Sequence, residues 1–295
     1  MRLVIASGKG GTGKTLVAIS LALVAAERAR GAERLPALLD ADVEAPNVGL
    51  FLQAEARETV SVARPVPVVD AARCTHCGRC AEVCQFNAIA ALPTQTLVFA
   101  ELCHGCGSCT LQCPAGAISE APQPMGRVTL GLGPGLRLGE GELQVGEAMA
   151  TPVIRALKRE AHRRGWHDEA VMIVDAPPGA ACPVIEALRG ADAALLVTEP
   201  TPFGLHDLRL AVEVARDVLG LPVGVAINRD DGGDATVEAY CSEEGLPVLL
   251  RLPLAREIAA AYSDGQPLVT ALPGYRPTFE AALDALLALA GEVRP

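Results

Sequence analysis

Residues 8 to 15, GKGGTGKT, have the composition and spacing of a loop that binds phosphate. Glycines let consecutive backbone N–H groups curl around phosphate oxygens, because no side chain blocks the approach. The lysine near the end can reach the outer phosphates, and the hydroxyl after it can hold Mg²⁺. An apolar run precedes the loop and a helical pattern, Leu16 to Ala29, follows it, which is the context that the motif requires. The predicted phosphate-binding residues are Gly8, Gly10, Gly11, Thr12, Gly13, Lys14 and Thr15.

Acidic residues follow two other short apolar runs. Asp40 ends PALLD and Asp42 comes two residues later, whereas Asp175 ends VMIVD and is followed by the turn APPG, which closes at Gly179. Ligands of open parallel sheets bind at the carboxyl ends of the strands, so a carboxylate there can bind Mg²⁺ through water or orient an attacking water. We expect Asp175 to contact Mg²⁺ through water and the Gly179 backbone to sense a γ-phosphate. Asp40 and Asp42 could instead be helix N-cap and turn residues.

Eight of the ten cysteines form two groups, each with the spacing C-x₂-C-x₂-C-x₃-C. This spacing is typical of bacterial ferredoxins that hold two 4Fe–4S clusters, in which the fourth cysteine of each group binds the other cluster. Four thiolates could also bind zinc, although zinc sites seldom use three cysteines at such even spacing. One position departs from the ferredoxin pattern, because Gln85 stands where a proline usually follows the fourth cysteine. The predicted ligand sets are Cys74, Cys77, Cys80 and Cys113 for one cluster, and Cys103, Cys106, Cys109 and Cys84 for the other.

The cysteine groups define the expected domain organisation. The sequences that follow the two groups repeat, with CQFNAI at 84–89 and CPAGAI at 113–118, which favours one compact two-cluster module. We expect a nucleotide-binding domain in two parts, 1–60 and 122–295, and an inserted ferredoxin-like domain at 61–121. Residues 122–146, rich in glycine and proline, are expected to form a hairpin that leads back to the nucleotide-binding domain.

Composition limits the class of protein further. Half of the 295 residues are hydrophobic but only 3% are aromatic, which suits helices packed on a buried parallel sheet. The formal net charge of −10 argues against bulk nucleic-acid binding. No apolar stretch of about 18 residues is present, and the phosphate-binding pattern begins almost at once after Met1. We therefore expect a cytoplasmic protein with no membrane span and no signal peptide, in which clustered cysteines bind metal rather than form disulfides.

These motifs together resemble the MinD, Mrp and nitrogenase-iron-protein group of P-loop ATPases. The resemblance lies in the deviant Walker A loop with Lys9, in DADVEAPN at 40–47 and in DAPPG at 175–179. It implies an α/β fold with a doubly wound, mostly parallel sheet, and an ATP-dependent homodimer or a heterodimer with a paralogue. By the same resemblance, Lys9 would reach into the nucleotide site of the partner, and Asp42 would handle the attacking water with support from Asp40. Asn228, at the end of VGVAIN, would contact adenine.

The leading hypothesis is an ATPase with slow or partner-stimulated hydrolysis. It would couple MgATP-driven dimer switching to electron transfer through two 4Fe–4S clusters, with a separate redox partner protein. Two alternatives are an iron–sulfur carrier or scaffold and a regulatory ATPase with redox-sensing clusters. Cys182, seven residues after Asp175, could join a cluster shared between subunits, although a small buried thiol is the simpler interpretation.

Overall fold

The computed structural model describes residues 1–166, 171–233 and 235–291. The described residues form two compact units. The first unit comprises residues 1–60, 128–142 and 150–295, and the second comprises residues 61–127 and 143–149. Each unit has its own architecture and is described separately below.

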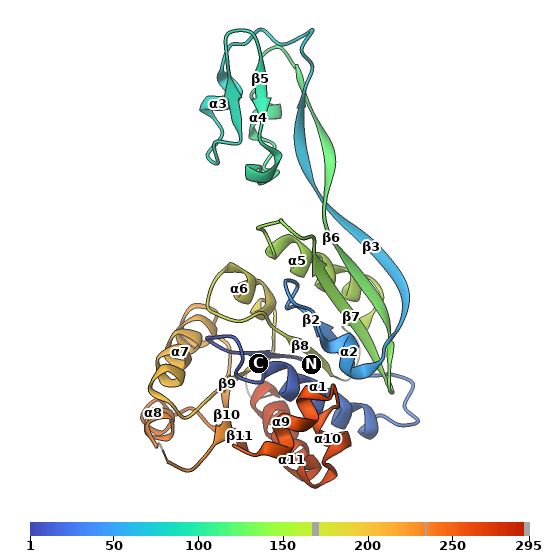
Figure 1. The fold of residues 1–295 in the computed structure, drawn as a ribbon, viewed down its shortest axis with the longest axis vertical. Helices are drawn as coiled ribbons and strands as arrows, with labels where there is room; N and C mark the ends of the chain where they lie inside the picture. The colour runs from blue at the N-terminus through green and yellow to red at the C-terminus, as the bar shows by residue number, and fades with distance from the viewer. Residues whose placement is uncertain (167–170, 234, 292–295) are drawn as a thin grey trace. The chain divides into compact units, whose positions relative to one another are not determined.

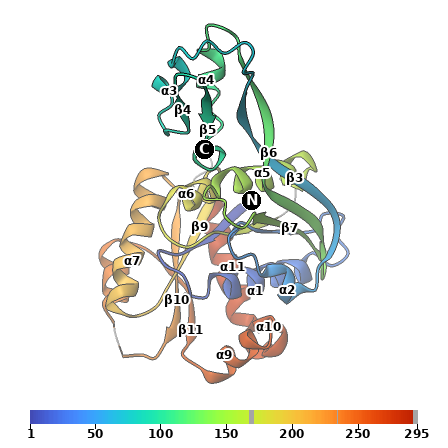
Figure 2. The ribbon, with the colours of Figure 1, turned by 45° about the horizontal axis from the view of Figure 1, so that its top comes forward.

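A nine-stranded sheet forms the centre of the first unit, with the strand order β11-β10-β9-β1-β8-β2-β7-β6-β3. All neighbouring pairs from β11 to β7 are parallel, which confirms the predicted mostly parallel α/β sheet. Figure 2 shows β9, β10 and β11 next to one another. The strands are β1 (Arg2–Ala6), β2 (Ala37–Asp40), β3 (Glu55–Val69), β6 (Ile118–Gly133), β7 (Leu136–Leu143), β8 (Met172–Asp175), β9 (Ala193–Thr198), β10 (Val223–Asp230) and β11 (Val248–Pro253).

The predicted hairpin at 122–146 is present as β6 and β7, but its first strand is longer than expected. β6 already begins at Ile118, and β3 begins at Glu55 rather than near residue 61. Both strands therefore begin in one unit and end in the other. The residues Glu55–Thr59 are exposed, so the start of β3 lacks the apolar alternation by which a half-buried strand is recognised.

Helices cover both faces of the sheet because alternate residues of each central strand point to opposite sides. Leu3 and Ile5 of β1 belong to an apolar core that also contains α1 and α11, and Figure 1 shows these two helices together with α10. Leu157 of α5 approaches the sheet at Gly139. The helices of this unit are α1 (Lys14–Arg28), α2 (Val48–Leu52), α5 (Thr151–Arg163), α6 (Cys182–Leu188), α7 (Pro202–Val212), α8 (Thr236–Glu243), α9 (Arg256–Ser263), α10 (Leu268–Ala271) and α11 (Arg276–Gly291).

The second unit is small, and apart from the end of β3 and the start of β6 its regular elements are short. It holds the helices α3 (Arg79–Glu82) and α4 (Ser108–Leu111) and an antiparallel pair, β4 (Ile89–Ala91) and β5 (Thr96–Val98). Its two small apolar clusters include cysteine side chains: Cys80 and Cys109 pack with Ile89 and Ile118 in one of them. The cysteines thus form part of the core of this unit.

Among the described residues, no helix is both long enough and apolar enough to cross a membrane.

Candidate functional site

The phosphate-loop motif lies between β1 and α1, as its sequence context predicts. Gly11 and Gly13 have φ angles of 79° and 93°, a backbone conformation that glycine adopts without strain. A side chain at Gly13 would also meet the Asn228 amide nitrogen at 2.3 Å. Because α1 begins at Lys14, the positive end of its dipole lies at the loop.

A large hollow opens beside this loop and encloses about 1050 Å³, part of it open to solvent. The segment after β2 contributes Asp42 and Asn47, and the opposite wall comes from the segment 253–263, which includes Ile258 and Tyr262. Such a concave site, with a polar end and an apolar wall, suits a ligand that carries phosphates at one end and a ring at the other. The residues that the loop contributes are Gly10, Gly11, Gly13, Lys14 and Thr15.

Charged groups at the polar end have perturbed pKa values. The Thr15 hydroxyl donates to Asp175 Oδ2 at 2.6 Å. Burial raises the pKa of Asp175 to about 7, although this hydrogen bond and the Lys14 charge oppose the shift. Burial also lowers the pKa of Lys14 and raises that of Asp42. Buried groups of opposite sign without full pairing are typical of sites where a charged ligand supplies the missing interactions.

Asp40 is not among the residues that line the hollow. Its side chain is fully buried, and its carboxylate accepts backbone hydrogen bonds from Asp42, Asn47 and Val48. Burial raises the pKa of Asp40 well above its ordinary value, and the neighbouring Asp175 adds to the shift. Asp40 therefore holds the backbone of the segment that carries Asp42.

Three other residues of the predicted site, Gly8, Thr12 and Gly179, are not among those that line the hollow. Gly8 packs so closely on α7 that a side chain there would meet the Asp207 carbonyl at 2.1 Å. The Gly179 N–H, predicted to sense a γ-phosphate, donates to the Ser7 carbonyl at 3.0 Å. Among the described residues, Thr12 Oγ1 and Asp175 Oδ1 are buried without a hydrogen-bond partner. Two orphaned oxygens near a phosphate loop fit a site that a hydrated cation and phosphate complete.

Asn228 lines the hollow, and its amide nitrogen also donates to the Thr12 carbonyl at 2.7 Å. This contact ties the end of β10 to the phosphate loop.

Sequence reasoning missed the next residue, Arg229, and also Tyr262, both of which line the hollow. Arg229 has a positive φ of 55°, which no sequence pattern signals. For Tyr262, the only signal was its place in the segment that follows β11.

The second unit contains two smaller hollows that are lined by cysteines from both groups. Cys74, Cys77, Cys80 and Cys113 line one hollow of about 340 Å³. Cys84, Cys103, Cys106 and Cys109 line another of about 370 Å³, and both volumes include space open to solvent. The structure thus brings together the same two sets of four cysteines that the spacing assigned. In each hollow the fourth cysteine comes from the other sequence group.

Backbone N–H groups point at the sulfur atoms of these hollows. Ala88 donates to Cys84 Sγ, Gly105 to Cys103 Sγ and Ala117 to Cys113 Sγ, each at 3.3 Å. Within the described part of the chain, no three His, Cys, Asp or Glu side chains converge as ligands of a single metal ion. In each hollow the four cysteines are among the lining residues.

The two isolated cysteines differ from each other. Cys241 is buried, as expected for a structural thiol. Cys182 is exposed, so the simpler interpretation of it as a small buried thiol is wrong. It is the first residue of α6, whose buried side includes Val184 and Leu188, and this places Cys182 on the solvent side of the helix start.

Comparisons with known proteins agree with this geometry. The family described as "CobQ/CobB/MinD/ParA nucleotide binding domain" matches residues 3–268. The chain is 35% identical over 214 residues to the uncharacterised protein MJ0578 of Methanocaldococcus jannaschii, which covers 72% of each chain. It is 28% identical over 261 residues to the uncharacterised protein MJ0579 of that organism, covering 83% of this chain and 90% of the relative.

Solved structures share the fold. The septum site-determining protein MinD of Pyrococcus horikoshii, in complex with Mg-ADP, has a TM-score of 0.56 and 20% identity, covering 99% of this chain and 95% of that one. The cell division ATPase MinD of Pyrococcus furiosus has a TM-score of 0.57 and 20% identity, and 98% of each chain is covered. A ParA family ATPase of Chlorobium tepidum has a TM-score of 0.54 and 15% identity, with 97% and 98% covered. With the phosphate loop, the parallel sheet and a match over most of its length, the chain belongs to the CobQ/CobB/MinD/ParA nucleotide-binding family.

Proposed function

We propose that this chain is an ATPase that acts as an ATP-dependent dimer and couples its nucleotide state to electron transfer through two 4Fe–4S clusters. The observation that carries the iron–sulfur part is the pair of four-cysteine hollows in the second unit. The observation that carries the nucleotide part is the hollow beside the phosphate loop, with its orphaned buried oxygens.

In the first unit, each residue has a proposed role that its position supports. Lys14 and the loop backbone would bind the phosphates, and Thr15 and Asp175 would hold Mg²⁺ directly and through water. Asp42 lines the hollow and would orient the attacking water. Lys9, which is one-third exposed, would complete the site of a second copy of the chain. The amide of Asn228 would contact the base while it holds the loop.

In the second unit, the donor set fits a 4Fe–4S cluster in each hollow. Four cysteines that line one hollow without converging on one point suit a cluster whose four irons each take one thiolate, whereas a single zinc ion needs four convergent ligands. When bound, the clusters supply one-electron transfer. The N–H groups of Ala88, Gly105 and Ala117 would stabilise the negative charge on the sulfurs, which tunes the reduction potential.

The helix α2 and the strand β3 follow one another in the chain between the nucleotide hollow and the first cysteine group. Asn47 lines the hollow, and α2 begins at the next residue. Phe51 of α2 packs on Tyr262, another residue of the hollow, with ring centroids 4.9 Å apart. β3 then begins at Glu55 and runs to Val69, five residues before Cys74. A nucleotide-driven shift of α2 would therefore pass directly into the strand that leads to the second unit.

The test is a redox titration of anaerobically purified protein. We expect about eight irons per chain, and an EPR signal whose midpoint potential or lineshape changes when MgATP is added. Tyr262→Ala should keep the iron and weaken this change, whereas Tyr275→Ala, which removes an aromatic residue of the unit outside the hollow, should not. Full iron content together with EPR spectra that do not change on addition of MgATP would contradict the coupling between nucleotide state and electron transfer. Ready transfer of the clusters to an apo-acceptor protein would favour the carrier function instead.

A regulatory role is the second candidate, because solved relatives include MinD proteins of cell division. In that case the clusters would sense redox state, and their oxidation would change ATP hydrolysis or dimerisation. The same preparation distinguishes the two functions: a regulatory protein would change its ATPase rate on oxidation without passing electrons to an acceptor.

A further inference from the structure

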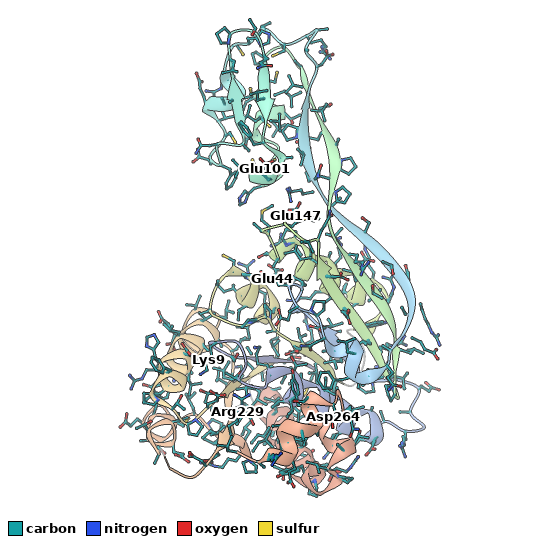
Figure 3. The ribbon with its side chains drawn as sticks, in the orientation of Figure 1. Lys9, Glu44, Glu101, Glu147, Arg229 and Asp264 are labelled. Atoms are coloured by element: carbon teal, nitrogen blue, oxygen red, sulfur yellow. The ribbon has the colours of Figure 1, made fainter. Side chains whose placement is uncertain are left out.

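Glu199 joins two cations that come from separate parts of the chain. Its Oε2 lies 3.0 Å from Lys9 Nζ, and its Oε1 lies 2.5 Å from Arg229 Nη1. The carboxylate is only 12% exposed, although the cations are partly open to solvent. Figure 3 labels Lys9 and Arg229. Lys9 belongs to the phosphate-loop motif and Arg229 lines the nucleotide hollow, so the carboxylate links the loop to the rim of that hollow.

The position of Glu199 is fixed by its backbone. It directly follows β9, and Thr198 Oγ1 donates to the Gly204 carbonyl at 2.9 Å. The Gly204 N–H in turn donates to Thr201 Oγ1, which caps α7. A side chain at Gly204 would meet the Glu199 carbonyl at 2.2 Å, so the turn is closely packed. A carboxylate on such a turn is held in place before any ligand arrives.

Arg229 restricts the carboxylate from the other side. It has a positive φ of 55° and follows Asn228, whose amide holds the Thr12 carbonyl of the loop. β9 lies between β1 and β10 in the sheet, which brings the ends of all three strands together. The three charged groups therefore form one cluster whose geometry depends on the order of the strands.

We propose that Glu199 is a positioning residue for Lys9, which holds the lysine on its own chain until a second copy with bound nucleotide competes for it. The inference rests on the proposed function, in which Lys9 acts on the nucleotide of a partner subunit. A partly exposed ion pair is weak, so a polyphosphate with several negative charges can displace the carboxylate. The ion pair therefore limits the motion of the Lys9 side chain but can be replaced by a stronger interaction.

The first test measures the contact on the single chain. The sequence contains three lysines, Lys9, Lys14 and Lys158. Lys14 is buried, and the Lys158 ammonium donates to three carbonyls, including that of Arg189 at 2.7 Å. Mild acetylation followed by mass spectrometry measures each lysine separately, so the Lys9 rate is compared between variants with the Lys14 and Lys158 rates as internal references. Glu199→Gln should raise the Lys9 labelling rate about two- to fivefold without nucleotide.

A matched control breaks a comparable ion pair elsewhere. Glu238 lies 2.5 Å from Arg251 in the same unit, and neither residue lines the nucleotide hollow. Glu238→Gln should leave Lys9 labelling unchanged. An unchanged Lys9 rate in Glu199→Gln would overturn the proposal, and this holds whether or not the protein dimerises.

The second test measures ATP-dependent dimerisation by sedimentation. Glu199→Gln should lower the protein concentration needed for half-dimerisation about two- to fivefold, and Glu199→Asp, which keeps the charge, should restore part of the restraint. The gain must disappear in a Lys9→Ala background if it acts through the lysine. Weaker dimerisation of Glu199→Gln, or a gain that persists without Lys9, would overturn the proposal. A wild-type chain that never dimerises with ATP would instead contradict the proposed function.

Discussion

At the scale of single residues, Asp42 is the acidic residue in the wall of the nucleotide hollow, and we propose it as the group that orients the attacking water. It lines the same hollow as Lys14 and Thr15, and the Lys14 charge partly offsets the effect of burial on its pKa. Its backbone is held in place because Asp40 accepts the Asp42 N–H. A carboxylate that is fixed but exposed to the ligand space is suited to orient a water molecule.

We therefore expect Asp42→Asn to bind ATP within about threefold of wild type and to hydrolyse it at least about 100-fold more slowly. The amide keeps the size of the side chain but loses the negative charge. Equilibrium binding of a fluorescent ATP analogue and phosphate release measure the two effects separately. Glu44→Gln, at an exposed neighbouring carboxylate, is the control that should change neither. Wild-type turnover in Asp42→Asn would remove Asp42 from the mechanism.

Asp175 should make the stability of the nucleotide-free protein depend on pH. Its pKa is about 7 in the folded chain against 3.8 ordinarily, so between these values the folded state binds more protons than the unfolded state. The free energy of unfolding therefore falls as pH rises from about 4 to about 7 and then levels off. Below pH 4 both states are protonated, and the contribution is constant.

Asp175→Asn removes this buried charge. We expect a shallower pH dependence and, at pH 8, a free energy of unfolding about 1–3 kcal/mol above that of wild type, because Oδ1 of the carboxylate has no hydrogen-bond partner among the described residues. Urea unfolding at pH 5 and pH 8, in the presence of a chelator, measures both effects. Asp264→Asn, at an exposed position, should behave as wild type. A variant that is less stable at pH 8 would mean that the charge is already compensated.

At the scale of elements, the approach of β10 to the phosphate loop depends on Gly13. Its φ is 93°, and a methyl group there would lie 2.3 Å from the Asn228 amide nitrogen, so the site has no room for one. Gly13→Ala should displace Asn228, break its bond to the Thr12 carbonyl and lower ATP affinity at least tenfold. Isothermal titration calorimetry measures the affinity.

Gly31→Ala is the matched control for this prediction. Gly31 has a similar φ of 82°, but a side chain there would meet nothing within 4 Å. The control variant should lose about 1–2 kcal/mol of stability through backbone strain alone and bind ATP normally. Equal effects of the two substitutions on ATP affinity would show that strain, and not the contact with Asn228, matters.

The elements also show what the sequence could and could not reveal. The loop and the strand ends with Asp40 and Asp175 were predictable because each follows from a local pattern of residues. The mostly parallel sheet was predictable because the composition suits it and because the motifs resemble a family with that fold. The link between Glu199, Lys9 and Arg229 was not, because it depends on β9 lying between β1 and β10. The length of β3 was missed for a different reason, since its exposed first residues carry no hydrophobic period.

At the scale of the whole molecule, the two units differ in what stabilises them. The first unit has a large apolar core on the sheet, in which side chains such as Phe279 and Leu286 are fully buried. The second unit has two small apolar clusters that contain cysteines. Small domains of this kind usually need metal or disulfides for stability.

Removal of the two proposed 4Fe–4S clusters should therefore unfold the second unit and leave the first intact. Metal binding supplies folding free energy where no sufficient apolar core exists. After oxidative loss of the clusters, hydrogen exchange should become fast across 61–127, while the phosphate loop keeps its slow exchange and its additional protection by MgADP. Cys113→Ser, which removes a cysteine from the lining of one hollow, should act in the same direction with about half of the iron lost.

Cys182→Ser provides the control, because this exposed thiol lies outside both cysteine hollows. We expect it to keep the full iron content and slow exchange in 61–127. If Cys182→Ser lost iron only in the dimer, a cluster shared between subunits would have to be added to the two proposed here. If instead the iron-free second unit stayed protected, its fold would not depend on the clusters, and the cysteine hollows would have to be explained as a rigid scaffold that forms before metal binds.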